Sequence, residues 1–503
     1  MSEFASIALH IMLYERLADE LAALIAKGPL RPGDRLPSIR RLAEQKRLSI
    51  STVVQALRQL EDRGWVEARP KAGYFVGSPS IPLPEPQPAA IDYQPTDVAV
   101  TQRLLAVLRA NDSRDFVPFG NACPAPELLP VARILRLYGR VARHYPKLLT
   151  DAGNTWTHNN LPALTRQIVK HSMEWGKVLD PAEITVTNSC AEAINLCLRV
   201  VTEPGDTVAV ESPTHFVFLQ ILENLGLKAL EIPCHAQHGL SVEALALATR
   251  LDAVRACLLI PNANNPLGTT IPEDHKRRIV RLLAERNIPL IEDDISGDLH
   301  FEGPRPPPLK AFDETGNVML CSSLSKALSS GIRVGFVAAG RHKNAVDLQK
   351  ALLNGITNPI SQMVVAEFME SGGYDRHLRA LRRALARQVQ CVSAAIAEHF
   401  PEGCRISRPK GGYVLWVELP ERCDASVLHR EAIAAGIAFT PGELFSASGL
   451  YRHYLRVSCG YPWDARMAAG IEKLGRLLAR QRFDERAPGD GYRHSPTEPG
   501  WQR

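Results

Sequence analysis

Three features are missing from this sequence of 503 residues, and each absence excludes a class of protein. No apolar run approaches the roughly 18 to 20 residues that cross a bilayer, so we expect no membrane protein. The first residues, MSEFASIALHIMLYERLADELAAL, lack a basic stretch followed by a cleavage site, so we expect a cytoplasmic location. Ten cysteines include no CxxC pair, which predicts reduced thiols without a disulfide framework or a metal site.

The composition is that of a globular protein with several domains. With 45% hydrophobic and 22% charged residues, a chain of this length is expected to form two to four domains. Prolines are dense in GSPSIPLPEPQPAAIDYQP, which predicts a semi-extended linker. We therefore divide the chain into a unit at 1–77, a linker and connecting segment at 78–114, a large region at 115–480 and a polar tail at 481–503 whose composition predicts disorder.

The first unit has the pattern of a winged helix-turn-helix. Apolar residues at helical spacing predict a helix over 11–26, and two further helices are predicted over 38–45 and 51–62. Two hydrophobic runs around RPKAGY then predict a β-hairpin. The unit carries 12 basic against 9 acidic residues, with six basic to two acidic in 31–47, as a phosphate-binding face requires.

This unit resembles the GntR family of bacterial transcription regulators through LRPGDRLPSIRRLA, STVVQALRQLEDRGWVEAR and GYFV. The resemblance implies contacts with double-stranded DNA from a set of polar and wing residues: Arg35, Arg40, Ser49, Ser51, Thr52, Lys71 and Gly73. The alternative is that Arg40 and Arg41 form an ordinary solvated helix face. Ile50 departs from the family, which often has arginine there.

The large region has the pattern of an α/β protein. Short hydrophobic runs such as EITVTN, TVAVES, ACLLIPN, IPLIEDD and NVMLCSS alternate with helix-length segments, which predicts a mostly parallel sheet over about 115–350. GYVLWVELP and YLRVSCG among helices predict a smaller α+β domain over about 351–480.

Several residues at predicted strand ends point to one ligand crevice. Lys326 follows the strand NVMLCSS, and it is either a surface cation or a reactive amine. Residues 189–191 precede a helix whose N-terminus can receive phosphate, and Arg333 can clamp phosphate. Asn265 lies in a turn, and IPLIEDD ends in carboxylates. A lysine amine, a phosphate cradle and a carboxylate are what pyridoxal phosphate needs.

The region resembles the fold type I aminotransferases through VTNSCAEA, GDTVAVESPTHF, PNANNPLG, LIEDD, SSLSK with its following arginine, and PGELFS with YLRVS. Joined to a GntR-type unit, it resembles the MocR subgroup of regulators. The resemblance implies that Lys326 anchors the cofactor, Asp293 pairs with its ring nitrogen and Asn265 bonds its ring hydroxyl. The implied phosphate, ring and effector contacts are Ser189, Cys190, Ala191, Ser323, Ser325, Arg333, His215 and Arg456.

Some positions depart from the aminotransferase pattern. Ser296 stands where a tyrosine is usual, Ser189 and Asn160 stand where glycines are usual, and His215 replaces an aromatic that stacks on the ring. His215 is therefore either a stacking residue or an ordinary, partly buried histidine. These departures favour cofactor capture over efficient transamination.

The sequence leaves three functional hypotheses open. The first is a homodimeric regulator that binds DNA and senses pyridoxal phosphate, an amino-acid-like or amine effector, or both. The second is an active aminotransferase with an appended DNA-binding domain, and the third is a regulator that has lost the cofactor. Fold type I sites are completed across a subunit interface, which is why the resemblance implies a homodimer.

Overall fold

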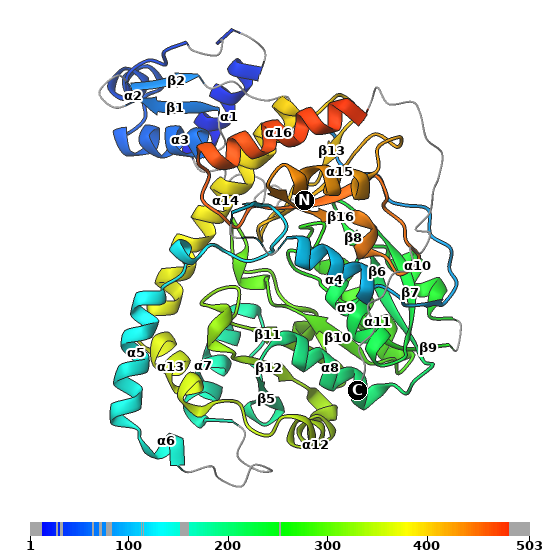
Figure 1. Ribbon diagram of the computed structural model, residues 1–503. Coiled ribbons are helices and arrows are strands. Elements are labelled where there is room, and N and C mark those ends of the chain that lie inside the picture. The colour runs from blue at the N-terminus through cyan, green and yellow to red at the C-terminus, as the bar shows by residue number, and fades with distance from the viewer. Residues whose placement is uncertain are drawn as a thin grey trace, which may run out of the picture.

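The computed structural model describes residues 13–26, 29–30, 34–62, 65–69, 73–76, 83–111, 113, 115–150, 160–250 and 253–481. Figure 1 shows a small N-terminal unit beside a much larger body. Lys71 lies outside the described residues, as does the predicted tail except for Gln481. None of the helices in the described ranges is long and apolar enough to span a membrane.

The N-terminal unit is a winged helix-turn-helix, as predicted. Its elements are α1 (Leu13–Ala26), α2 (Ile39–Lys46), α3 (Ile50–Asp62), β1 (Val66–Arg69) and β2 (Gly73–Val76). The apolar face of α1, with Leu17 and Leu21, packs against Val53 and Leu57 of α3 in a core of its own. β1 and β2 form the antiparallel wing. The helical spacing of the apolar residues thus dictates which side of each helix is left to solvent.

The segment after this unit lies against the large body. The backbone of Ile406 donates to the carbonyl of Pro84 at 2.9 Å, and the amide of Gln87 donates to the Glu418 carboxylate at 2.9 Å. β3 (Thr96–Asp97) then joins the edge of the large sheet, and α4 (Thr101–Ala110) follows. Because proline has no backbone N–H, a proline-rich segment cannot form regular strand pairing of its own. Its contacts with the smaller domain therefore determine its path.

The large domain is built on a mostly parallel sheet. Its strand order is β3, β7 (Lys228–His235), β6 (Thr207–Ser212), β9 (Val254–Leu259), β10 (Leu290–Asp293), β11 (Val318–Ser323), β12 (Gly335–Ala338) and β5 (Ile184–Thr187), with β8 (Gly239–Leu240) paired to β7. The strands from β7 to β11 run parallel, whereas β12 is antiparallel to both β11 and β5. β5 therefore runs in the same direction as β11.

Helices cover both faces of this sheet, which is why its strands are apolar throughout. In β9, Ala256 and Leu258 face one core while Cys257 and Leu259 face another, because side chains alternate along a strand. The covering helices are α7 (Pro162–Ser172), α8 (Cys190–Val201), α9 (Phe216–Asn224), α10 (Val242–Ala248), α11 (Glu273–Glu285), α12 (Lys343–Leu353) and α13 (Pro359–Glu370). Two further helices, α5 (Val131–His144) and α6 (Lys147–Thr150), pack against α13.

The smaller domain begins with a long helix. α14 (Gly373–His399) runs from the large domain toward the smaller one (Figure 1). A four-stranded sheet follows in the order β13 (Arg405–Ile406), β14 (Val414–Glu418), β17 (Tyr454–Ser458) and β16 (Thr440–Pro441), with α15 (Ala425–Ala434) and α16 (Ala465–Gln481). β4 (Val117–Pro118) pairs with β15 (Ile437–Ala438), so the chain passes through this domain between β3 and the other strands of the large sheet.

Candidate cofactor crevice and DNA-binding face

Strand ends bring most of the predicted crevice residues to one edge of the large sheet. Because β5, β6, β9, β10 and β11 run in the same direction, the residues after them emerge on one side. These residues are Ser189 after β5, His215 after β6, Asn265 after β9, Asp293 at the end of β10, and Ser323 and Lys326 at and after the end of β11.

Lys326 lies partly buried in this crevice. Its Nζ donates to the carbonyl of Ala122 at 2.8 Å and lies 3.1 Å from the Sγ of Cys123. Burial opposes the charge of the amine, but the Tyr413 hydroxyl and the Cys123 thiol raise the pKa of Lys326 above its ordinary value. This amine is therefore held by specific neighbours inside the protein, and the interpretation as a solvated surface cation does not fit.

Tyr413 and Cys123 are crevice residues that the sequence did not indicate. The Tyr413 hydroxyl donates to the same carbonyl, that of Ala122, at 3.1 Å. The glycines before Tyr413 bring it there: a Cβ on Gly411 would meet the backbone of Leu299 and His300 at 3.0 Å. The double glycine in KGGYVLW was the available signal, because glycine marks a close approach of two backbones.

The three carboxylates of IEDD have separate surroundings. Glu292 accepts from the backbone amides of Leu309 and Lys310, and Asp294 pairs with Arg305. Asp293 accepts from the amide of Ile295 at 2.9 Å and from the Cys190 thiol at 3.3 Å.

Burial raises the pKa of Asp293 to about 6. The charge of Lys326 acts in the opposite direction and lowers this pKa. Asp293 has no arginine or lysine ion pair among the described residues, and it can serve a cationic ring nitrogen.

Arg456 lies in β17 and reaches the crevice from the smaller domain. Its Nη1 donates to Oδ1 of Asn265 at 3.2 Å, and its Nη2 donates to Oγ1 of Thr440 at 3.0 Å and to the carbonyl of Gly120. Burial lowers the pKa of Arg456 to about 10. Its Nε is buried without a hydrogen-bond partner, so the guanidinium has donor capacity to spare for a carboxylate.

His215 is partly buried at the start of α9, and its ring centroid lies 4.7 Å from that of Phe216 and 5.8 Å from that of Phe218. Burial, Arg456 and Lys326 lower the pKa of His215 to about 3. The imidazole is therefore neutral at physiological pH, and a neutral ring can lie against another aromatic ring without a charge to solvate.

The predicted phosphate contacts lie at the start of α8, at the end of β11 and in the connection that follows β11. The Ser189 hydroxyl accepts from the amide of Glu192 at 3.1 Å and caps the helix, whose first residues are Cys190 and the exposed Ala191. Ser323 Oγ accepts from the amide of Ser325, whose own hydroxyl is buried without a partner. Arg333 is exposed and forms no ion pair with any described residue. A spare hydroxyl, a helix N-terminus and a free guanidinium fit a phosphate group.

Two departures from the aminotransferase pattern have local explanations. The Asn160 amide donates to the carbonyl of Ile184 and accepts from the amide of Val186 at 2.8 Å. Asn160 thus pairs the open edge of β5 in the way a neighbouring strand would. Ser296 lies just before the short helix Gly297–Leu299, where the aminotransferase pattern has a tyrosine. In this protein a different tyrosine, Tyr413, supplies a hydroxyl that raises the pKa of Lys326.

The predicted DNA contacts among the described residues are exposed or partly exposed on the N-terminal unit. Arg40 and Ser51 are exposed, and Arg35 forms a β-bridge with Phe75 of the wing, so that its guanidinium lies near Gly73. The Ser49 hydroxyl accepts from the amide of Thr52 at 3.1 Å, and so it caps α3. The side chain of Ile50, at the start of α3, is 55% exposed.

The fold and the two sites define a class of protein: a winged helix-turn-helix joined to a fold type I aminotransferase-like body. Comparison with known families agrees. Residues 13–76 match the bacterial regulatory proteins of the gntR family, and residues 142–474 match aminotransferase class I and II. The chain belongs to the MocR subgroup of GntR-family regulators, which combine these two parts.

One kind of relative covers nearly the whole chain, and the aminotransferases cover about three quarters of it. An uncharacterized HTH-type transcriptional regulator of Escherichia coli, YjiR, is 36% identical over 93% of this chain and 99% of its own. The 2-aminoadipate transaminase of Thermus thermophilus is 30% identical over 74% of this chain and 92% of its own. The solved structure of LysN, an α-aminoadipate aminotransferase from Thermus thermophilus, has a TM-score of 0.69 at 27% identity, covering 77% of this chain and 96% of that one. Aminotransferases of class I and II depend on pyridoxal phosphate.

Proposed function

We propose that this protein is a transcription regulator that binds pyridoxal phosphate in the crevice and responds to the cofactor, to an amino-group effector, or to both by changing how it binds DNA. The observation that carries the proposal is the combination, in one chain, of a DNA-binding unit with a partly buried lysine at the strand ends of an aminotransferase fold. The name of the relative that spans 93% of the chain supports the regulatory role. A regulator acts where the chromosome lies, so a cytoplasmic location follows from this role.

The crevice residues suit the separate parts of the cofactor. Lys326 would hold the aldehyde carbon, Asp293 the proton on the ring nitrogen and Asn265 the ring hydroxyl. Ser189, Ser323, Ser325, Arg333 and the first amides of α8 would hold the phosphate. When bound, pyridoxal phosphate supplies an aldehyde that captures amino groups and a ring that withdraws electrons.

Arg456 offers a route from effector to DNA. It belongs to the smaller domain, yet it bonds Asn265 of the large domain. An effector carboxylate that takes over Arg456 would replace this bridge between the domains. The smaller domain also holds the linker, through Ile406 and Glu418. A shift of this domain would therefore carry the linker with it, provided that the effector binds one arrangement better than the other.

A homodimer is part of the proposal. Two copies related by a twofold axis would present two recognition helices to a palindromic operator.

The test is a DNA-binding selection on the full-length protein with and without pyridoxal phosphate. We expect an enriched operator sequence, and we expect its affinity or half-site spacing to change when the cofactor is added. A Lys326→Ala variant should still enrich the operator but lose the response. If no sequence is enriched at any salt concentration, the regulator proposal is wrong.

The alternative function is transamination, and the hydroxyl of Tyr413 beside Lys326 is the observation that favours it. In this case the protein would turn over amino acids with 2-oxo acids as amino acceptors. Turnover of a panel of amino acids, measured with the same preparation, separates the two functions. Strong turnover without any preference for a DNA sequence would show that the protein is an enzyme and not a regulator.

A further inference from the structure

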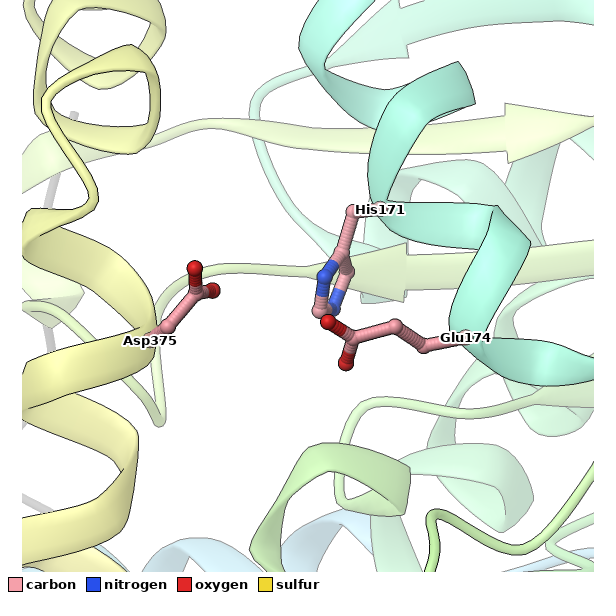
Figure 2. Close-up of side chains that lie close together, drawn as sticks. All are labelled: His171, Glu174 and Asp375. Atoms are coloured by element: carbon pink, nitrogen blue, oxygen red, sulfur yellow. The ribbon is translucent and has the colours of Figure 1, made fainter.

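Three side chains with metal-binding atoms face one another near Asp298. They are His171 near the end of α7, Glu174 in the short helix Met173–Trp175, and Asp375 in the first turn of α14 (Figure 2). One nitrogen or oxygen atom of each lies within 4.8 Å of the others. The two carboxylates are exposed, whereas the side chain of His171 is only 8% exposed.

The imidazole of His171 is held in one orientation. Its Nε2 lies 2.9 Å and 3.1 Å from the two carboxylate oxygens of Asp298. Its ring packs edge-on against Trp175, at 5.6 Å, and against Tyr374, at 5.3 Å. A carboxylate that holds the proton on one imidazole nitrogen leaves the other nitrogen as an electron-pair donor, and this pairing orients histidines that bind metal ions. Nδ1 is the nitrogen left for a ligand.

The two carboxylates beside this imidazole lack an ion pair of their own. Among the described residues, neither Glu174 nor Asp375 forms an ion pair with a lysine or an arginine. Two carboxylates close together repel each other, and a shared cation removes the repulsion. His171 and Glu174 are three residues apart, about one helical turn, so they project to the same side and leave the third position to α14.

We propose that His171, Glu174 and Asp375 bind a divalent transition-metal ion of the zinc or manganese class, with water completing the coordination. An imidazole together with carboxylates suits these ions, whereas calcium and magnesium prefer oxygen ligands alone. The ion would join α7 to the start of α14.

A metal ion at this site would also affect the cofactor crevice, through α14. On α14, the Tyr374 hydroxyl donates to Asp298 at 2.7 Å, and the His377 ring lies 2.6 Å from the carbonyl of Ala327, the residue after Lys326. A metal ion at Asp375 would therefore stiffen the helix that contacts the turn of Lys326.

The test uses Co²⁺ as a probe on untagged, full-length protein freed of metal by a chelator. The variants are Glu174→Gln, Asp375→Asn and the double variant, all of which alter exposed side chains and leave the His171 and Asp298 pair intact. Glu370→Gln, an exposed acidic residue at the end of α13, is the matched control. Zn²⁺ is then used to displace Co²⁺ and to measure the thermal shift.

We expect one equivalent of Co²⁺ with visible d–d bands and without the near-ultraviolet band of a cobalt–thiolate bond. Each single variant should weaken binding roughly tenfold or more, and the double variant should abolish it. Zn²⁺ should raise the melting temperature of the wild type and of Glu370→Gln, but not that of the double variant. Equal binding by the wild type and the double variant, a thiolate band as the sole signal, or no binding at millimolar Co²⁺ would each overturn the proposal.

Discussion

The DNA-binding face and the cofactor crevice are built in opposite ways. On the N-terminal unit, Arg40 and Ser51 stand exposed on one small helical core. In the crevice, Lys326, Asp293 and Arg456 are withdrawn from water, and their pKa values shift as a result of burial and of their neighbours. On an exposed face, the binding free energy is the sum of many small contacts. In a buried site, each charged group makes a large contribution to binding. Single substitutions should therefore have large effects in the crevice and small effects on the face.

The largest expected effect is that of Lys326→Ala. Without the amine, the protein should lose the visible absorption band of lysine-bound pyridoxal phosphate completely, because Lys326 is the lysine placed at the strand ends that form the crevice. The check is an absorption spectrum after reconstitution, with Lys473→Ala, which changes an exposed lysine on α16, as a control. A band that persists in Lys326→Ala would assign the covalent anchor to another residue.

The second effect concerns Asp293 and has a predictable sign. The pKa of Asp293 in the folded protein is about 6, above the ordinary 3.8, so the folded state binds the proton more tightly than the unfolded state. Stability without cofactor should therefore fall as pH rises from about 4 to about 6, and the loss persists above that.

Asp293→Asn should accordingly raise the free energy of unfolding of the cofactor-free protein at pH 7 to 8 by about 1–3 kcal/mol. The same variant should retain pyridoxal phosphate poorly, since it no longer holds the ring proton. Urea unfolding at several pH values measures the first effect, and dialysis against buffer measures the second. If the free energy of unfolding depends on pH in the same way in Asp293→Asn and in the wild type, burial does not destabilise the charged carboxylate of Asp293.

Arg456→Gln should separate two kinds of effector. Loss of a buried guanidinium that grips a carboxylate costs roughly 2–5 kcal/mol, so amino acids should lose most of their influence on DNA affinity. Amines without a carboxylate should keep theirs. DNA binding measured against matched pairs, such as an amino acid and the amine that lacks its carboxylate, decides between these outcomes. Equal losses for both would point to a structural role of Arg456 at Asn265.

Ile50→Arg should produce the smallest change, on the exposed face. Ile50 already projects into solvent, so an arginine costs little folding free energy and adds one potential phosphate contact. The slope of log affinity against log salt should steepen by about 0.9.

Lys71→Ala should instead make this slope shallower and weaken binding to all sequences alike. If either substitution, Ile50→Arg or Lys71→Ala, changes the affinity for the operator sequence alone, the residue at that position contacts bases.

Several parts of the fold were predictable because they are local in sequence. The helical spacing from Ile11 to Ile25 and the pair of helices after it led to the winged helix-turn-helix, which is confirmed. The continuous hydrophobic runs led to the large sheet, since strands buried on both faces need apolar residues throughout. Lys326, Asp293 and Asn265 were predicted because each stands beside the end of such a run, and the structure brings all three to the same edge of the large sheet. Their role in binding a cofactor stays a prediction.

Other residues could not be predicted because their partners are distant in sequence. Tyr413 and Lys326 both donate to the carbonyl of Ala122, and Lys326 also reaches Cys123, only after the smaller domain packs against the large one. The His171 cluster likewise depends on α14 returning to α7, and its spacing of His-x-x-Glu carried too little information to predict a metal site. Asn160 stands where the aminotransferase pattern has a glycine, and the sequence does not indicate that its amide pairs with β5.

The sequence by itself determined the two-part architecture and the position of Lys326 after the end of a strand, because periodicity, turn residues and short motifs act within a few residues. Only the tertiary structure decided what surrounds that lysine, which of the three carboxylates pairs with Arg305, and how Arg456 bridges the two domains. Burial and the resulting pKa shifts depend on packing between elements far apart in the chain, and no local pattern records that packing.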